Sequence, residues 1–266
     1  MLILNDNNEV GIDAGGYICP EDEASPIWNY FFEDFSFLQE VNIYMYGLFD
    51  MINANQDDVI ECFLAETYNK IHKDYQTGFL LASRGLIEQS KIMLRVILDK
   101  IMIMQAVYDN NENYNLWLKH QAYQRNRLIK DIKEKKSGLE HLYDKVKEID
   151  LDPDARYVSS KEWASLSAME SEYNITYRLF SGSVHYSLSA YEGDVIFSDG
   201  RPEEIMIGPQ IDDMEILLIT LATDALKATK IISNHYEIRD ERYAQLDNKL
   251  QLRQSELMKL VINNGW

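Results

Sequence analysis

Cysteine, glycine and proline are all scarce in this chain of 266 residues. The two cysteines, Cys19 and Cys62, are too few for a disulfide scaffold or a four-cysteine zinc site, and they suit a reducing cytoplasm. The 12 glycines and 5 prolines are too few for a collagen-like chain, a disordered tail or a turn-rich β-sandwich. No apolar run reaches the roughly 18 residues of a membrane-spanning helix, and residues 1–10 have neither the basic start nor the apolar centre of a signal peptide. We therefore expect a cytoplasmic protein with no membrane partner.

Basic residues are missing from the first quarter of the chain. Residues 1–69 hold 14 acidic residues and no lysine or arginine. The whole chain has 44 acidic and 26 basic residues, a net charge of −18, which disfavours a protein that coats nucleic acid without sequence preference. The segment 119–147 has the opposite balance, with nine basic and four acidic residues. These charges either line solvent-exposed helix faces, or bring the acidic and basic segments into contact within one subunit or between neighbours.

The spacing of the apolar residues predicts a mainly α protein, a helical bundle of about seven helices. We expect an irregular acidic arm or a small hairpin over residues 1–25, followed by a single helical domain over 26–266. The turn signal at Asp199-Gly200 predicts one small β-hairpin at about 194–208. The predicted helices lie at about 27–52, from 58 onward, 78–108, 112–148 (a helical hairpin), 160–188, 211–237 and 239–263.

Three of these predicted helices begin at residues that favour helix starts. Ser25 and Pro26 form an N-cap and first position for the first helix, and Asp57-Asp58 cap the second. Ser159 or Ser160 caps the helix that is expected to continue to residue 188.

The most apolar stretch, residues 78–108, is predicted to form one helix with its charged residues on a single face. These charged residues are three or four positions apart, as one helix face requires. The face is either a solvent-exposed stripe or a polar seam that meets a partner helix or a cleft, with Arg84 and Glu88 as an ion pair. The residues on it are Arg84, Glu88, Lys91, Arg95 and Asp99.

The common motifs for metals and cofactors are absent from the sequence. None of the five histidines follows a glutamate at the Glu-x-x-His spacing, and no His-Glu-x-x-His or Cys/His zinc spacing occurs. There is no phosphate-binding or dinucleotide-binding glycine loop either. We therefore expect neither a metal nor a cofactor.

One segment, residues 173–185, combines residue types that suit phosphodiester chemistry. Arg178 and His185 are seven positions apart, nearly two helical turns, so a helix would place them on one face with Ser181 between them. An arginine neutralises a phosphate, and a histidine transfers protons near neutral pH. The alternative is a structural hydrogen-bond cluster of arginine, tyrosine and serine at a helix end.

Two blocks of the sequence resemble the DUF5677 family of uncharacterised bacterial proteins. They are residues 80–94, LLASRGLIEQSKIML, and residues 172–188, EYNITYRLFSGSVHYSL. The Arg178-x6-His185 spacing also resembles the Arg-x(4–6)-His signature of the HEPN superfamily. This resemblance implies an all-α fold, homodimers in which Arg and His of two subunits meet, and metal-independent RNA cleavage by toxins or phage-defence proteins.

Two hypotheses of function follow. In the first, the protein is a ribonuclease of a toxin or phage-defence type, paired with a protein partner such as an antitoxin. Arg178 binds the scissile phosphate and His185 is the general acid and base, while the ribose 2′-hydroxyl attacks and a cyclic phosphate forms. The supporting polar groups would be Asn174, Tyr177 and Ser181, and the RNA-backbone contacts Arg125, Arg127 and Lys130.

In the second hypothesis, the protein is a non-catalytic helical module for interaction or dimerisation. Arg178 and His185 then fix a contact between helices, and the acidic first quarter of the chain binds a protein partner.

Overall fold

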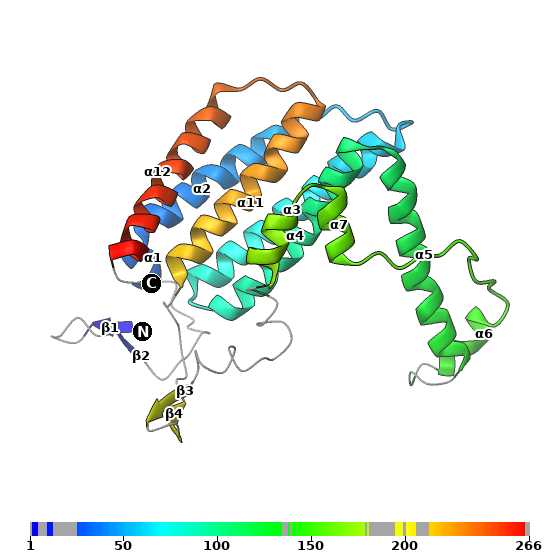
Figure 1. Ribbon diagram of the computed structural model, residues 1–266, viewed down its shortest axis with the longest axis horizontal. Coiled ribbons are helices and arrows are strands. Elements are labelled where there is room, and N and C mark those ends of the chain that lie inside the picture. Colours follow the sequence, from blue (N-terminus) through cyan, green and yellow to red (C-terminus); the bar gives the residue numbers. More distant parts are fainter. Residues whose placement is uncertain are drawn as a thin grey trace. The chain divides into compact units, whose positions relative to one another are not determined.

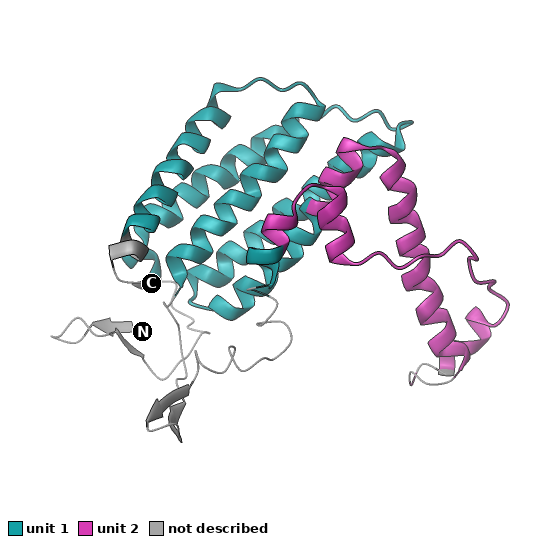
Figure 2. Ribbon diagram, viewed as in Figure 1, with its two compact units in different colours: residues 1–101, 174–266 teal, residues 102–173 magenta. Residues whose placement is uncertain are grey.

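The computed structural model of this chain is mainly helical, as the sequence predicts (Figure 1). It describes residues 26–134, 138, 140–178, 180 and 213–263, and the backbone of four short strands. The helices form two compact units, one of residues 1–101 and 174–266 (unit 1) and one of residues 102–173 (unit 2) (Figure 2). None of the described helices is long and apolar enough to cross a membrane.

Unit 1 is built around α11, which packs against α2, α3 and α12. Residues Leu217, Leu221 and Ala225 of α11 have no exposed surface, and Tyr68 and Tyr75 of α3 are buried in the same unit. The helices that contribute to unit 1 are α1 (Pro26–Tyr30), α2 (Phe32–Gly47), η1 (Leu48–Asp50), α3 (Val59–Ser83), α4 (Ile87–Asp109), α11 (Met214–His235) and α12 (Glu241–Asn263).

Unit 2 begins within α4 and centres on one long, polar helix, α5. The Asn126 side chain holds the 151–155 loop against α5: its amide nitrogen donates to the Asp152 carbonyl over 2.8 Å, and its oxygen accepts from the Asp152 N–H over 3.1 Å. The further elements are α5 (Glu112–Lys133), η2 (Glu140–Leu142), α6 (Tyr143–Val146), α7 (Ser160–Leu166), α8 (Glu170–Glu172) and the start of the π-helical turn η3 (Tyr173–Tyr177).

Local capping explains several helix starts, and these predictions are confirmed. Pro26 is the first residue of α1. Asp58 caps α3 by accepting from the Ile60 and Glu61 N–H groups, and Ser159 caps α7 by accepting from the Glu162 N–H. Ser25 lies outside the described residues.

The prediction of one helix over residues 78–108 is wrong. The helix α3 ends at Ser83, and α4 begins at Ile87. Gly85, at φ +73°, closes α3 with a Schellman motif, in which the Leu86 N–H donates to the Leu81 carbonyl over 3.0 Å. Arg84 is therefore an exposed C-cap residue of α3 and does not share a helix with Glu88.

The prediction of one helix from residue 160 to 188 is also wrong. Instead, α7 ends at Leu166, where Ala168 takes a left-handed φ of 52° and the Met169 N–H donates to the Ala164 carbonyl. The short helix α8 and the π-helical turn η3 follow. The first helix is likewise divided at Phe31, between α1 and α2.

The strands form two antiparallel pairs. Strand β1 (Leu2–Leu4) pairs with β2 (Val10–Ile12) in the segment expected to be an irregular arm or a small hairpin. Strand β3 (Val195–Ser198) pairs with β4 (Arg201–Ile205), with an irregularity after Ile196, in the segment where the sequence predicts a hairpin. The rest of residues 1–25 lies outside the described part of the chain, so the arm and the domain limit at residue 25 stay predictions.

Candidate functional site

The candidate site in unit 1 centres on a contact between Arg95 of α4 and Tyr177 at the end of η3. The Arg95 Nη2 donates to the Tyr177 hydroxyl over 2.9 Å, and the guanidinium carbon lies 4.9 Å from the centre of the tyrosine ring. The Arg95 Nε is buried and has no hydrogen-bond partner among the described residues. Arg95 therefore contributes a positive charge next to this turn while one of its own donors is unused.

The π-helical turn sets which side chains of this segment point inward. A π turn contains more residues than an α turn, and such turns occur often at functional sites. Here Tyr177 is 7% exposed and Phe180 is 3% exposed, whereas Asn174 and Arg178 are exposed. Adjacent residues thus have opposite environments: Tyr177 is fixed in the protein interior and Arg178 faces solvent.

The charged residues of α4 form a half-buried row. Lys91, whose side chain is 15% exposed, binds Glu88 over 2.8 Å and Asp213, before α11, over 3.3 Å. Arg95 and Asp99 are also only partly exposed. This burial favours the polar seam over the solvent-exposed stripe, with Arg84 now excluded from the row.

The predicted catalytic and supporting residues are only partly within the described chain. The structure places Asn174, Tyr177 and Arg178 on one short turn. Ser181 and His185 lie outside the described residues. Their position relative to Arg178 therefore stays a prediction.

The predicted RNA-backbone contacts lie on α5, in unit 2, and all three are exposed. Arg127 and Lys130 line a pocket of about 640 Å³ between α5 and the 151–155 loop. Arg125 lies 3.9 Å from the Asp152 carboxylate. Acidic residues line the same pocket, so its charge is mixed.

Sequence reasoning missed the role of Arg95. The charge spacing placed it on the α4 face, but its partner Tyr177 is 82 positions away in the sequence. Only the contact of Arg95 with Tyr177, the residue before Arg178, places Arg95 at the same site as Arg178.

The described residues do not gather three histidine, cysteine, aspartate or glutamate side chains that could hold a metal ion. The described part of the candidate site consists of the exposed Arg178, the buried Tyr177 and the half-buried Arg95.

The model of a family of unknown function, DUF5677, matches residues 61–202. This range includes most of α3, all of α4 and α5, and the segment with Tyr177 and Arg178. No curated protein and no solved structure matches the chain.

Proposed function

The chain belongs to the DUF5677 family, whose function is unknown, and we propose that it is a metal-independent ribonuclease. One observation carries the proposal: the exposed Arg178 follows directly after Tyr177, which is buried and hydrogen-bonded to Arg95. A cationic side chain next to a fixed anchor can bind a phosphate from solvent with a defined direction.

In the proposed reaction, Arg178 binds the scissile phosphate and neutralises its charge as it grows in the transition state. His185 accepts the proton of the ribose 2′-hydroxyl, whose oxygen forms a bond to phosphorus as the bond to the 5′-oxygen breaks. The protonated His185 then gives this proton to the leaving 5′-oxygen, and the products are a 2′,3′-cyclic phosphate and a 5′-hydroxyl. Ser181 and Asn174 serve as supporting polar groups.

The proposal includes the oligomeric state of the protein and its role in the cell. The protein is a homodimer in which Arg178 of one subunit and His185 of the other share a cleft, as in the HEPN superfamily that its sequence resembles. Arg125, Arg127 and Lys130 hold the RNA backbone, and the enzyme acts in the cytoplasm as a toxin or in phage defence, with an antitoxin as its protein partner.

The test is an RNA cleavage assay on the purified full chain in the presence of EDTA. We expect Arg178→Ala and His185→Ala each to lower the cleavage rate by about 10²–10⁴-fold, the usual effect of removing a proton-transfer group or a charge stabiliser. Lys161→Ala is the matched control, because Lys161 is an exposed cation on α7 without a role in the site. Circular dichroism checks that all variants keep their helix content.

Wild-type activity that disappears in EDTA would contradict the metal-independent mechanism. Equal rates for His185→Ala and the Lys161→Ala control would contradict the role of His185.

One observation favours the second candidate function, a non-catalytic interaction module. Three large apolar residues on one face of α2, Phe32, Ile43 and Tyr46, are 58%, 51% and 66% exposed. They lie within the acidic first quarter of the chain, so the partner would present a basic, apolar surface. Loss of partner binding in Ile43→Lys, with no RNA cleavage by the wild type, would support this function instead.

A further inference from the structure

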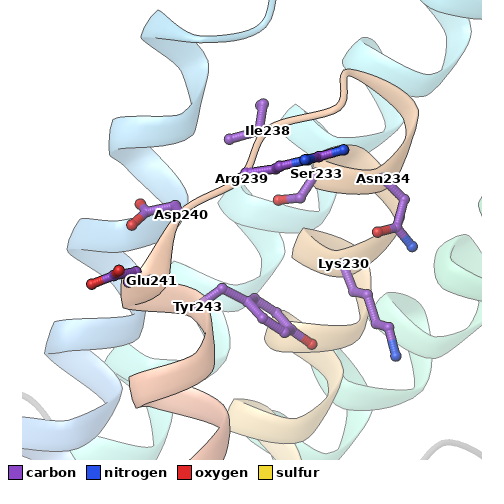
Figure 3. Close-up of a pocket in the computed structure, with 8 residues that line it drawn as sticks. All are labelled: Lys230, Ser233, Asn234, Ile238, Arg239, Asp240, Glu241 and Tyr243. Atoms are coloured by element: carbon purple, nitrogen blue, oxygen red, sulfur yellow. The ribbon is translucent and has the colours of Figure 1, made fainter.

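A pocket of about 520 Å³ lies in unit 1, where the chain turns from α11 into α12 (Figure 3). This volume is in the range of small-molecule sites. Its walls come from the last two turns of α11, the connecting turn and the first turn of α12. The pocket lies outside residues 61–202, the range that the family model matches.

Backbone hydrogen bonds fix the shape of this corner. Helix α11 ends in a Schellman motif, in which the Ile238 N–H donates to the Ser233 carbonyl over 2.8 Å and Glu237 takes a φ of 53°. The Asp240 carboxylate then accepts from the Arg242 N–H over 2.8 Å at the start of α12. The pocket is therefore formed before any ligand arrives, and Asp240 is already engaged.

Two buried hydroxyl groups at this corner have unused hydrogen-bonding capacity. Ser233 lines the pocket and is 8% exposed, and Tyr44 of α2 is 3% exposed. Burial raises the pKa of Tyr44, and Ser233 lies near enough for a weak polar contact with the Tyr44 hydroxyl that partly opposes that rise. Yet neither hydroxyl meets the geometry of a hydrogen bond with any described residue. Because a buried polar group without a partner is unfavourable, the Ser233 hydroxyl gains a hydrogen bond if its side chain rotates toward a polar ligand atom in the pocket.

The charged side chains around the pocket are separated by sign. Figure 3 shows Lys230, Asn234 and Arg239 on one side, and the Asp240 and Glu241 carboxylates on the other. Lys230 and Arg239 are exposed and have no ion-pair partner within the described part of the chain. Two free cations, an amide and a hydroxyl thus border the same space, which suits a group with several anionic oxygens.

We propose that this pocket binds a small phosphate monoester of nucleotide size. The phosphate lies between Lys230 and Arg239, and the Ser233 hydroxyl donates to one of its oxygens. The ring of Tyr243, which also borders the pocket, packs against the flat base of the ligand.

Calorimetric titration of the full chain with AMP, inorganic phosphate and adenosine tests this proposal. We expect AMP to bind more tightly than phosphate, and adenosine to bind most weakly because it has no anionic group. Lys230→Gln and Arg239→Gln should each weaken AMP binding about tenfold, since each removes one charge-assisted contact. Ser233→Ala should weaken AMP binding by a smaller factor and leave the thermal stability of the free protein unchanged or higher.

Two control variants distinguish binding in this pocket from binding elsewhere on the protein. Lys259→Gln removes an exposed cation of α12 that does not line the pocket, and it should bind AMP as the wild type does. Arg178→Ala should also bind AMP normally, because Arg178 belongs to the proposed RNA site. No AMP binding by the wild type, an equal loss in Lys259→Gln, or a loss in Arg178→Ala alone would each overturn the proposal.

Discussion

At the scale of single residues, the candidate site depends on a tyrosine that holds an arginine in place. Tyr177 offers Arg95 both a ring face and a hydroxyl oxygen. A cation above an aromatic ring is stabilised most when both groups are partly removed from water. This contact connects α4 to the turn that carries Arg178, so it helps to set the backbone position of Arg178.

Replacing Tyr177 by Phe tests this contact. The ring stays, but Arg95 loses its hydrogen-bond acceptor, so we expect the free energy of unfolding to fall by about 1–2 kcal/mol. Urea unfolding measures the change. Tyr30→Phe is the matched control because Tyr30 is 70% exposed, and an equal effect in both variants would contradict the importance of this contact.

Burial lowers the pKa of two histidines. Burial lowers the pKa of His72 from 6.5, although its hydrogen bond with Asn42 opposes the change. Burial also lowers the pKa of His120, whose Nδ1 accepts from the Val158 N–H over 3.0 Å. Both histidines are therefore neutral in the folded protein at pH values where the unfolded chain already binds a proton.

The stability of the protein should consequently depend on pH. The contribution of these histidines is fully present above pH 6.5 and is lost as the pH falls below it, because unfolding then takes up protons. Thermal melts between pH 5 and pH 8 measure this dependence. His120→Gln should lose less thermal stability on acidification than the wild type. An unchanged or larger loss of stability would contradict a lowered pKa of His120 in the folded protein.

At the scale of helices and strands, the first residues of the helices could be predicted from the sequence better than the last ones. Asp58 and Ser159 cap their helices through their own side chains, so the residue type is a sufficient signal. Two residues after the ends of α7 and α11 lie Ala168 and Glu237, which take left-handed backbone angles that these residue types disfavour. Packing of the surrounding structure sets the backbone angles at such positions, and the spacing of apolar residues does not report it. The sequence therefore wrongly predicted a helix that continues through Ala168.

A pair of substitutions tests whether backbone angles set these helix ends. Gly85→Ala should lower the free energy of unfolding by about 1–2 kcal/mol, because φ is +73° there. Ala168→Gly should raise it by about 1 kcal/mol, since glycine accepts φ of 52° without strain. Chemical denaturation of both variants measures the changes, and a stabilising Gly85→Ala would contradict the structure at that turn.

At the scale of the whole molecule, charge is distributed unevenly, and part of it is already paired. In unit 1, the acidic residues of α2 bind the basic residues of α12: Glu40 binds Lys249 over 2.6 Å, and Asp34 forms an ion pair with Arg253. Some of the acidic first quarter is thus neutralised within its own unit. The predicted contact between residues 1–69 and 119–147 stays a prediction.

The candidate site was predictable only in part. Arg178 stands out in the sequence because of its spacing from His185, but the role of Arg95 depends on a contact between distant segments. The pocket between α11 and α12 depends on how the chain folds back over residues 230–243.

The proposed dimer is also a property of the whole molecule. Light scattering should give twice the 31.1 kDa mass of one chain, and a monomer would contradict a site shared between subunits.

The central claim is that this protein cleaves RNA by attack of the 2′-hydroxyl, without a metal. The most direct measurement is analysis of the ends of an RNA incubated with the full chain in EDTA. We predict 2′,3′-cyclic phosphate and 5′-hydroxyl ends with the wild type and intact RNA with His185→Ala. Intact RNA with both proteins, or 5′-phosphate ends, would contradict the claim.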